Sequence, residues 1–185
     1  MTSLIQTIII PILGRHDLLE RAIKSIPECD TLILIDNGDE LSHDTINSWH
    51  HDQLLDGINS VYLWRMPSPL SVAASWNLGI KATPHSDGWL LLNSDAWFEN
   101  IAAFDKYCDD ARRDNILLAG VPGWCCAWIG AEVVKRVGLF CERYHPAYME
   151  DIDYQRRAEV CGFAVDTSSA RVGHDNSSTI ASDPV

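Results

Sequence analysis

The polar residues that could carry chemistry in this chain are grouped in two short segments. The first is Asn93-Ser94-Asp95, which directly follows the apolar run Gly88–Leu92. The second is Glu150-Asp151-Ile152-Asp153, which has three carboxylates in four positions. Carboxylate oxygens bind divalent cations, and a carboxylate within hydrogen-bond reach can take a proton from a hydroxyl group. The two segments therefore indicate a metal or phosphate site and an acid–base site.

Each segment also has a purely structural explanation. Asp95 could cap a helix that follows it, because Asp, Asn and Ser are favoured at helix starts. Acidic residues in the first turn of a helix complement its dipole, which accounts for part of the second segment. Crowding of the three carboxylates Glu150, Asp151 and Asp153 should nevertheless raise the pKa of at least one of them, which suits a general base.

The elements that must position these groups alternate between strands and helices in the first half of the chain. Short apolar runs predict buried strands at residues 7–10, 31–35, 61–64 and 89–92. Apolar residues at helical spacing predict helices at residues 18–26, 44–55 and 73–80, with Asp17 as the N-terminal cap of the first. This alternation predicts a doubly wound, mainly parallel sheet. Its strand ends share one edge, so we expect Pro11, Asp36 and Asp95 to lie close together.

The second half of the chain has a more aromatic character. It is predicted to hold helices at residues 104–113 and 131–137 and a strand at 117–119. A further helix is expected to start immediately after the three carboxylates at 150–153 and to run to Cys161-Gly162. The bulky segment Gly123–Ile129 contains Trp124 and Trp128. These two indole rings could form a binding wall, but large aromatic side chains dominate interior packing, which favours the core.

The composition is that of one soluble globular domain of 185 residues, with 46% hydrophobic and 22% charged residues. The 14 basic and 26 acidic residues give a net charge of −12, which argues against generic nucleic-acid binding, since that needs clustered Lys and Arg. No apolar run is long enough to span a bilayer and no secretory signal is present, so we expect a cytoplasmic protein. The six cysteines contain no Cys-x-x-Cys pair and are expected to be reduced and mostly buried.

Several motifs, taken in order, resemble those of the family 2 glycosyltransferases of the GT-A fold. They are Thr7-Ile8-Ile9-Ile10-Pro11 with Arg15-His16-Asp17-Leu18-Leu19, Ile35-Asp36-Asn37-Gly38, Ala73-Ala74-Ser75-Trp76-Asn77-Leu78-Gly79-Ile80, Leu91-Leu92-Asn93-Ser94-Asp95 and Glu150-Asp151-Ile152-Asp153. The resemblance covers roughly residues 5 to 180 and depends on the order of the motifs. It implies an α/β fold with a single GT-A catalytic domain over residues 1–185, with a nucleotide-binding half at about 1–98 and an acceptor-binding, catalytic half at about 99–180.

The resemblance also implies an activity, namely the inverting transfer of a sugar from a nucleoside-diphosphate sugar, most commonly a UDP-sugar, to an acceptor hydroxyl. The residues implied for nucleotide binding are Pro11, Arg15, Asp36, Asn77 and Asn93. Asp95 is the implied ligand of a Mn²⁺ or Mg²⁺ ion, and His174 resembles the late histidine that often completes this metal site. The first Asp of the family's Asp-x-Asp motif is Asn93 here, which should weaken binding of the cation.

On the acceptor side, the resemblance assigns Asp151 as the general base with Glu150 beside it, and we expect Trp124 and Asp153 to contact the acceptor. The chain is short for this family, and we expect it to lack the additional C-terminal helices that often bind acceptors or membranes there. We therefore expect a soluble or protein-borne acceptor, with a partner or a second copy in a homo-oligomer supplying the missing wall.

Other interpretations remain open at the level of the sequence. A nucleotidyltransferase-like enzyme would usually have a glycine-rich, basic N-terminal loop, whereas this chain offers only Gly14-Arg15. A non-catalytic nucleotide-sugar-binding module or an inactive relative is hinted at by Asn93. A carboxylate-based hydrolase fits less well, because the carboxylates follow strand ends in a way that suits a diphosphate. His174 on its own is equally explained as a buried hydrogen-bonding residue.

Overall fold

A computed structural model of the chain describes residues 5–38 and 41–175. The strands are β1 (Thr7–Ile12), β2 (Cys29–Asp36), β3 (Ile58–Arg65), β4 (Gly88–Leu92), β5 (Ala96–Phe98), β6 (Ile116–Ala119), β7 (Cys126–Gly130), β8 (Val165–Thr167) and β9 (Val172–His174). The helices are α1 (His16–Lys24), α2 (His43–His51), α3 (Val72–Ala82), α4 (Ile101–Asp110), α5 (Ala131–Val137) and α6 (Glu150–Val160), with a 3₁₀ turn, η1, at Gly123–Cys125.

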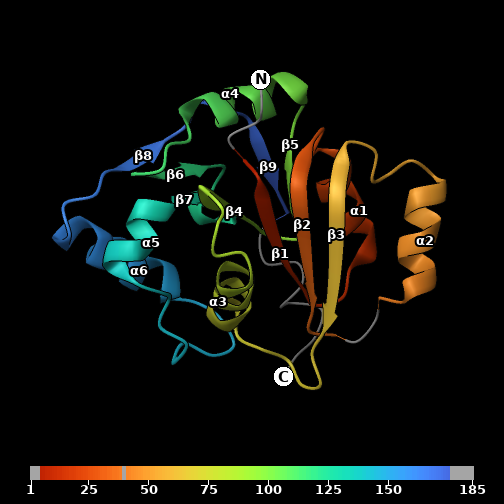
Figure 1. Cartoon of the computed structure of the whole chain (residues 1–185), viewed down its shortest axis with the longest axis horizontal. Coiled ribbons are helices and arrows are strands. Elements are labelled where there is room, and N and C mark those ends of the chain that lie inside the picture. The colour runs from red at the N-terminus through yellow and green to blue at the C-terminus, as the bar shows by residue number, and fades with distance from the viewer. Residues whose placement is uncertain (1–4, 39–40, 176–185) are drawn as a thin grey trace.

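The main sheet has seven strands in the order β3-β2-β1-β4-β7-β6-β8, and β5 and β9 pair in a separate two-stranded ribbon (Figure 1). The pairs β1–β2, β1–β4, β2–β3 and β6–β8 are parallel. Only β7, which lies between β4 and β6, runs antiparallel to its neighbours in this sheet. The predicted α/β fold with a mainly parallel sheet is confirmed.

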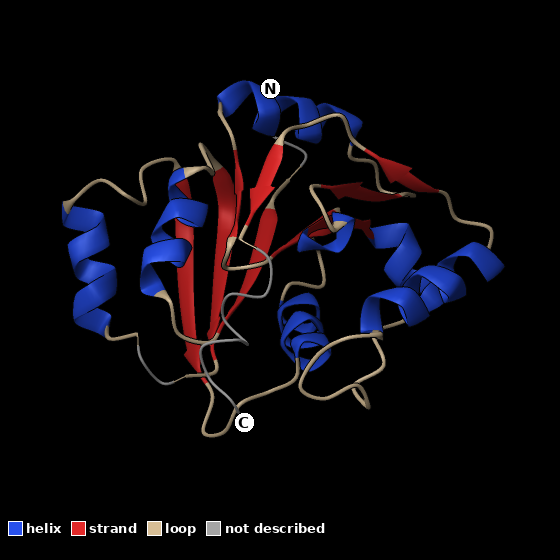
Figure 2. Cartoon of the chain, turned by 180° about the vertical axis from the view of Figure 1, so that it is seen from behind, coloured by secondary structure: helices blue, strands red, loops and turns tan. Residues whose placement is uncertain are grey.

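The sheet separates two hydrophobic layers. Alternate residues of β1 point to opposite faces, so that Ile8 and Ile10 belong to one cluster and Ile9 to the other. Helices α1, α2 and α4 cover the first face, and α3, α5 and α6 cover the second. Figures 1 and 2 show this from the two sides, with α3 in front of the sheet in one view and α1 in front in the other.

One prediction about a helix start is wrong, and the alternative explanation of Asp95 as a helix cap is excluded. Asp17 does not cap α1, which begins after Arg15 in a left-handed conformation (φ 53°) with no side-chain cap; Asp17 instead accepts a hydrogen bond from Arg15 within the first turn. Asp95 does not cap a helix either, because the strand β5 follows it.

The structure also shows which elements the bulky segment at 123–129 forms. It forms η1 and then β7, which inserts between β4 and β6 with Trp128 fully buried. In the part of the chain that the structure describes, no helix combines the length and hydropathy needed to cross a bilayer.

Candidate nucleotide and metal site

The ends of the parallel strands meet at one edge of the sheet, as the sequence predicts. Ile12 at the end of β1 is paired with Asp36 at the end of β2, and β4 runs parallel to β1 on its other side. The turn after β1 carries Arg15 and the turn after β4 carries Asp95. The pKa of Arg15 is raised mainly by its hydrogen bond to Asp17, and the nearby negative charge of Asp95 adds to this. The charges of Arg15 and Asp95 are therefore near enough to interact.

A buried pair formed by Asp95 and His174 lies at this edge. Nε2 of His174 is 3.1 Å from Oδ1 of Asp95, and the two side chains are only 5% and 6% exposed. The ribbon brings them together, because Ala96 of β5 is paired with His174 of β9. The hydrogen bond to Asp95 raises the pKa of His174, against the opposing effect of burial.

The 3.1 Å separation is that of an ordinary hydrogen bond between Nε2 and Oδ1. The same two atoms could both be ligands of a divalent cation once Nε2 carries no proton, since ligands at right angles on octahedral Mg²⁺, at about 2.1 Å from the ion, are about 3.0 Å apart. Cys125 lies nearby, but burial and the charge of Asp95 raise the pKa of its thiol to about 12, so it is protonated at neutral pH. Over residues 5–38 and 41–175 no group of three His, Cys, Asp or Glu side chains converges on a metal position. A bound cation would take its other ligands from substrate and water.

The predicted nucleotide-binding residues around the strand ends have structural partners as well. Asp36 is fully buried, and its two carboxylate oxygens accept hydrogen bonds from the backbone N–H groups of Gly38 (3.1 Å) and Leu41 (2.9 Å). These bonds fix the turn after β2. Pro11 is partly buried inside β1, and Asn93 donates its backbone N–H to the carbonyl of Cys125 at 2.9 Å.

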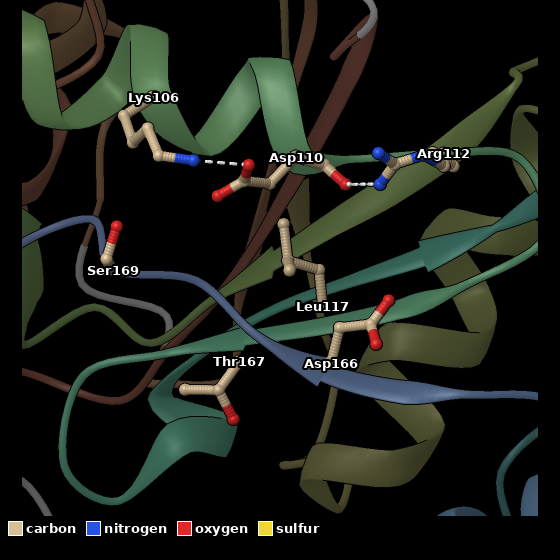
Figure 3. A pocket seen from close by; sticks show the side chains of 7 residues that line it. All are labelled: Lys106, Asp110, Arg112, Leu117, Asp166, Thr167 and Ser169. Carbon is tan, nitrogen blue, oxygen red and sulfur yellow. Dashed lines mark hydrogen bonds and ion pairs between the residues drawn. The ribbon is translucent and has the colours of Figure 1, made fainter.

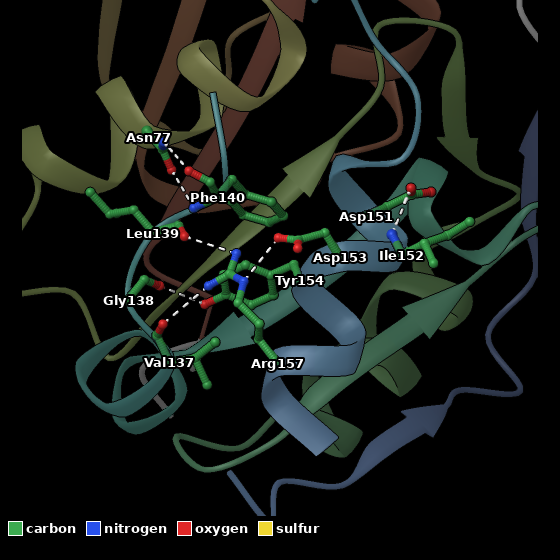
Figure 4. Close-up of polar contacts among 10 residues, drawn as sticks. All are labelled: Asn77, Val137, Gly138, Leu139, Phe140, Asp151, Ile152, Asp153, Tyr154 and Arg157. Atoms are coloured by element: carbon green, nitrogen blue, oxygen red, sulfur yellow. Dashed lines mark hydrogen bonds and ion pairs between the residues drawn. The ribbon is translucent and has the colours of Figure 1, made fainter. Parts of the chain in front are cut away.

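Asn77 lies in the middle of α3 and is 1% exposed. Its Nδ2 donates to the Phe140 carbonyl (3.0 Å) and to Oε1 of Glu142 (2.8 Å), and its Oδ1 accepts from the Phe140 N–H (2.9 Å). The amide thus fastens the segment after α5 onto α3 (Figure 4). These bonds account for Asn77 without a nucleotide and do not support the predicted contact with one.

The three carboxylates at the start of α6 lie in different surroundings. Glu150 is 5% exposed, and its Oε2 has no hydrogen-bond partner among the described residues. Burial raises the pKa of Glu150, with a smaller contribution from the charge of Asp151. Asp151 is half-buried, and its Oδ1 accepts from the N–H of Ile152 at 2.7 Å. The expected rise in one carboxyl pKa is confirmed, and its main cause is burial and not crowding.

Asp153 has a clear structural role. It accepts a hydrogen bond from Nε of Arg157 at 2.9 Å, and Arg157 donates onward to the carbonyls of Val137 (3.1 Å) and Leu139 (3.0 Å) (Figure 4). The pair clamps the turn that follows α5 onto α6. This arrangement does not support the expected contact between Asp153 and an acceptor.

Trp124 is 9% exposed and belongs to the core cluster on the α3, α5 and α6 face. Its ring centroid is 6.1 Å from that of Phe140 and 6.4 Å from that of Tyr154, both at steep angles. Its Nε1 donates to Oε1 of Gln155 at 3.4 Å. Of the two interpretations open to the sequence, the structure favours the core, and the predicted acceptor contact of Trp124 has no support here.

Two residues that lie next to the Asp95–His174 pair were not predicted from the sequence. Arg21 of α1 donates from Nη2 to Oδ2 of Asp175, directly after His174. Asp175 could have been suspected because it adjoins His174. Arg21 carried no usable signal, since its partner is 154 positions away.

A shallow depression of about 460 Å³ lies elsewhere, between the end of α4 and strands β6 and β8 (Figure 3). Lys106 pairs with Asp110, Arg112 donates to the Asp110 carbonyl, and Asp166 accepts from Asn115. None of the residues that line it belongs to the turns carrying Arg15 or Asp95. It is therefore separate from the strand-end site.

Solved structures with the same fold include three glycosyltransferases. The chain superposes on a crystal structure of GalNAc-T7 with UDP, GalNAc and Mn²⁺ (TM-score 0.72, 12% identity, 92% of this chain and 43% of that one). It also superposes on the mannosyltransferase PcManGT from Pyrobaculum calidifontis with GDP-Man and Mn²⁺ (TM-score 0.69, 13% identity, 91% of this chain and 56% of that one). A third match is S. aureus TarS 1–349 (TM-score 0.68, 11% identity, 96% of this chain and 62% of that one). No protein-family model and no curated protein matches the sequence. The likeness establishes a GT-A fold, and the chain spans less than two thirds of each of these neighbours.

Proposed function

We propose that the chain is a metal-dependent, inverting glycosyltransferase that moves a sugar from a nucleoside-diphosphate sugar to an acceptor hydroxyl. The observation that carries the proposal is the buried Asp95–His174 pair, which lies at the strand-end edge of a GT-A sheet with ligand atoms 3.1 Å apart. In open α/β sheets, ligands bind at this edge. The GalNAc-T7 and PcManGT structures contain UDP or GDP-Man together with Mn²⁺, which supports the same class of ligand here.

On the donor side, Asp95 and His174 would hold Mn²⁺ or Mg²⁺, and Arg15 lies close enough to attract the diphosphate. When bound, the cation would neutralise the charge that develops on the diphosphate as the glycosidic bond breaks. We assign the nucleoside to the ends of β1 and β2, with Pro11 and Asp36, and to Asn93 after β4. Asp36 is fully buried, so it would act by fixing the turn after β2. We assign the donor half to about residues 1–98, with His174 added to it from the catalytic half at about 99–180.

On the acceptor side, we assign Asp151 as the general base. The acceptor oxygen attacks the anomeric carbon, its proton passes to the carboxylate of Asp151, and the nucleoside diphosphate leaves from the opposite face, which inverts the configuration. Asp151 is half-buried and can meet an acceptor that arrives from solvent, whereas Glu150 is 5% exposed. We assign Glu150, the neighbour of Asp151 in sequence, a supporting role. Asp151→Asn should abolish transfer with little effect on donor binding, and Glu150→Gln should reduce turnover less.

The acceptor itself is assigned only by class. Three large apolar side chains flank Asp151 and are well exposed, namely Tyr148 (58%), Met149 (50%) and Ile152 (43%). We take these residues as part of the acceptor surface, completed by a partner or a second copy of the chain. None of the six cysteines, all of which lie in the described part of the chain, forms a disulfide, which fits a reducing compartment such as the cytoplasm.

The first experiment is calorimetric titration of the protein with UDP, with and without Mn²⁺, on wild type and Asp95→Ala. Metal-dependent binding that the substitution abolishes supports the proposal. Asp87→Asn is the matched control, because Asp87 precedes the other end of β4 and pairs with Arg113 at 2.6 Å. Failure to bind any uridine, thymidine or guanosine diphosphate under either condition would refute the proposal. Binding without hydrolysis or transfer over a panel of donors and acceptors would favour the non-catalytic module instead.

A further inference from the structure

The position of His174 depends on a very short piece of structure. Strands β5 and β9 have three residues each, and their antiparallel pairing sets Ala96 beside His174 and Trp97 beside Gly173. A two-stranded ribbon is marginally stable on its own. Something outside the ribbon must therefore hold the two strands in register.

Arg21 of α1 contacts both strands of this ribbon at once. Its guanidinium carbon lies 3.5 Å from the centroid of the Trp97 ring, a cation–π contact with β5. Its Nη2 donates to Oδ2 of Asp175, the residue that follows β9. The backbone N–H of Asp175 in turn donates to the carbonyl of Asp95 at 3.1 Å. Arg21 is thus linked through Asp175 to Asp95 by hydrogen bonds and to His174 along the chain.

The packing around Trp97 leaves little freedom for adjustment. A Cβ atom added at Gly173 would lie 2.3 Å from Cζ2 of Trp97, so the indole ring rests directly on the glycine backbone. A second link from α1 is made by Ser25, whose Oγ accepts from the N–H of Phe98 at 3.1 Å. Contacts from α1 and its C-cap residue Ser25 therefore hold the ribbon in place.

We propose, on the basis of the glycosyltransferase function assigned above, that Arg21 is a positioning residue that holds the spacing of Asp95 and His174 and thereby sets the affinity for the divalent cation. Its ion pair with Asp175 is about 40% exposed on both sides, and such pairs contribute little to global stability. Groups that orient metal ligands typically change metal affinity by about 10- to 100-fold when removed. Loss of Arg21 should therefore weaken the cation site without unfolding the protein.

The sign of the effect separates this role from simple electrostatics. Arg21 is a cation, so removing its charge should tighten binding of Mn²⁺ if only Coulomb repulsion matters. A positioning role has the opposite consequence, because the two ligands lose their fixed separation. Titration of Mn²⁺ alone, without nucleotide, keeps any direct contact between Arg21 and a diphosphate out of the comparison.

The test measures Mn²⁺ affinity from the loss of the free-ion electron paramagnetic resonance signal, with and without UDP, on wild type, Arg21→Gln and Arg21→Lys. We expect Arg21→Gln to bind Mn²⁺ about tenfold or more weakly, with Arg21→Lys in between and a melting temperature close to that of wild type. Arg171→Gln is the matched control, since Arg171 pairs at 3.7 Å with Glu99 at the far end of the same ribbon, and its affinity should stay within about twofold of wild type.

Unchanged or tighter Mn²⁺ binding in Arg21→Gln, with a wild type that binds the ion, overturns the positioning role and leaves the proposed function intact. Equal weakening in Arg171→Gln also overturns it, because loss of either surface ion pair of the ribbon then has the same effect and nothing is specific to Arg21. A wild type that takes up no Mn²⁺ in either arm refutes the proposed function itself, and with it the role of Arg21.

Discussion

Asn77 provides the sharpest separation between a structural and a nucleotide-binding role. Asn77→Ala removes three hydrogen bonds and leaves the N–H and C=O of the buried Phe140 without their partners. Each buried, unsatisfied backbone group costs about 1–3 kcal/mol, so the free energy of unfolding should fall by roughly 2–6 kcal/mol. For a chain of this size a loss of about 3 kcal/mol lowers the melting temperature by about 6–12 °C. The bond to Glu142 should add little, because that side chain is 49% exposed.

The assay combines thermal unfolding with UDP titration at a temperature well below the transition. The structural role predicts a large drop in melting temperature for Asn77→Ala and a dissociation constant for UDP close to that of wild type. Asn77→Asp keeps the acceptor for the Phe140 N–H but turns a negative charge toward the Phe140 carbonyl and Glu142, so it should destabilise at least as much at neutral pH. Asn47→Ala is the control, since Asn47 is exposed on α2 and its loss should change stability by no more than about 0.5 kcal/mol.

The reverse pattern would refute this reasoning. If Asn77→Ala melts within about 1 °C of wild type while its affinity for UDP falls tenfold or more, the amide faces the nucleotide and not Phe140. The hydrogen bonds from Asn77 to the segment after α5 would then contribute nothing measurable to the free energy of unfolding.

Three further changes test other parts of the structure. Burial raises the pKa of Glu150 above its unfolded value of about 4.3. The stability that this group contributes is therefore present below the unfolded pKa and is lost as the pH rises through the folded pKa. Glu150→Gln should melt at a higher temperature than wild type at pH 7 and at the same temperature below about pH 4. Trp124→Ala should cost about 3–5 kcal/mol in denaturant unfolding and Trp124→Phe clearly less, whereas a surface binding wall would tolerate both. Gly88→Ala would place a Cβ 2.3 Å from Cζ2 of Trp128, and it should destabilise by about 1–3 kcal/mol in thermal unfolding.

Local pattern in the sequence was sufficient for the frame of the site. Apolar runs and helical spacing predicted β1, β2, β3 and β4 and the helices between them to within a few residues, because these patterns report directly which side chains must be buried. The parallel arrangement followed from the alternation, and it placed Asp36 and Asp95 at one edge. The direction of the pKa shift at the start of α6 was also predicted, but from crowding of the carboxylates, whereas its main cause is the burial of Glu150 in the tertiary structure.

Tertiary structure decided what each polar group does at that edge. The ribbon of β5 and β9 brings His174 to Asp95. The side-chain amide of Asn77 is hydrogen-bonded to the backbone of Phe140, 63 residues further along the chain. Arg21 pairs with Asp175, which is 154 residues away in sequence. The periodicity of a segment records its own burial and backbone preference, but it holds no information about which distant segment packs against it. Pairing between remote segments depends on how the whole chain fills its two cores, so these partners emerge only when the fold is complete.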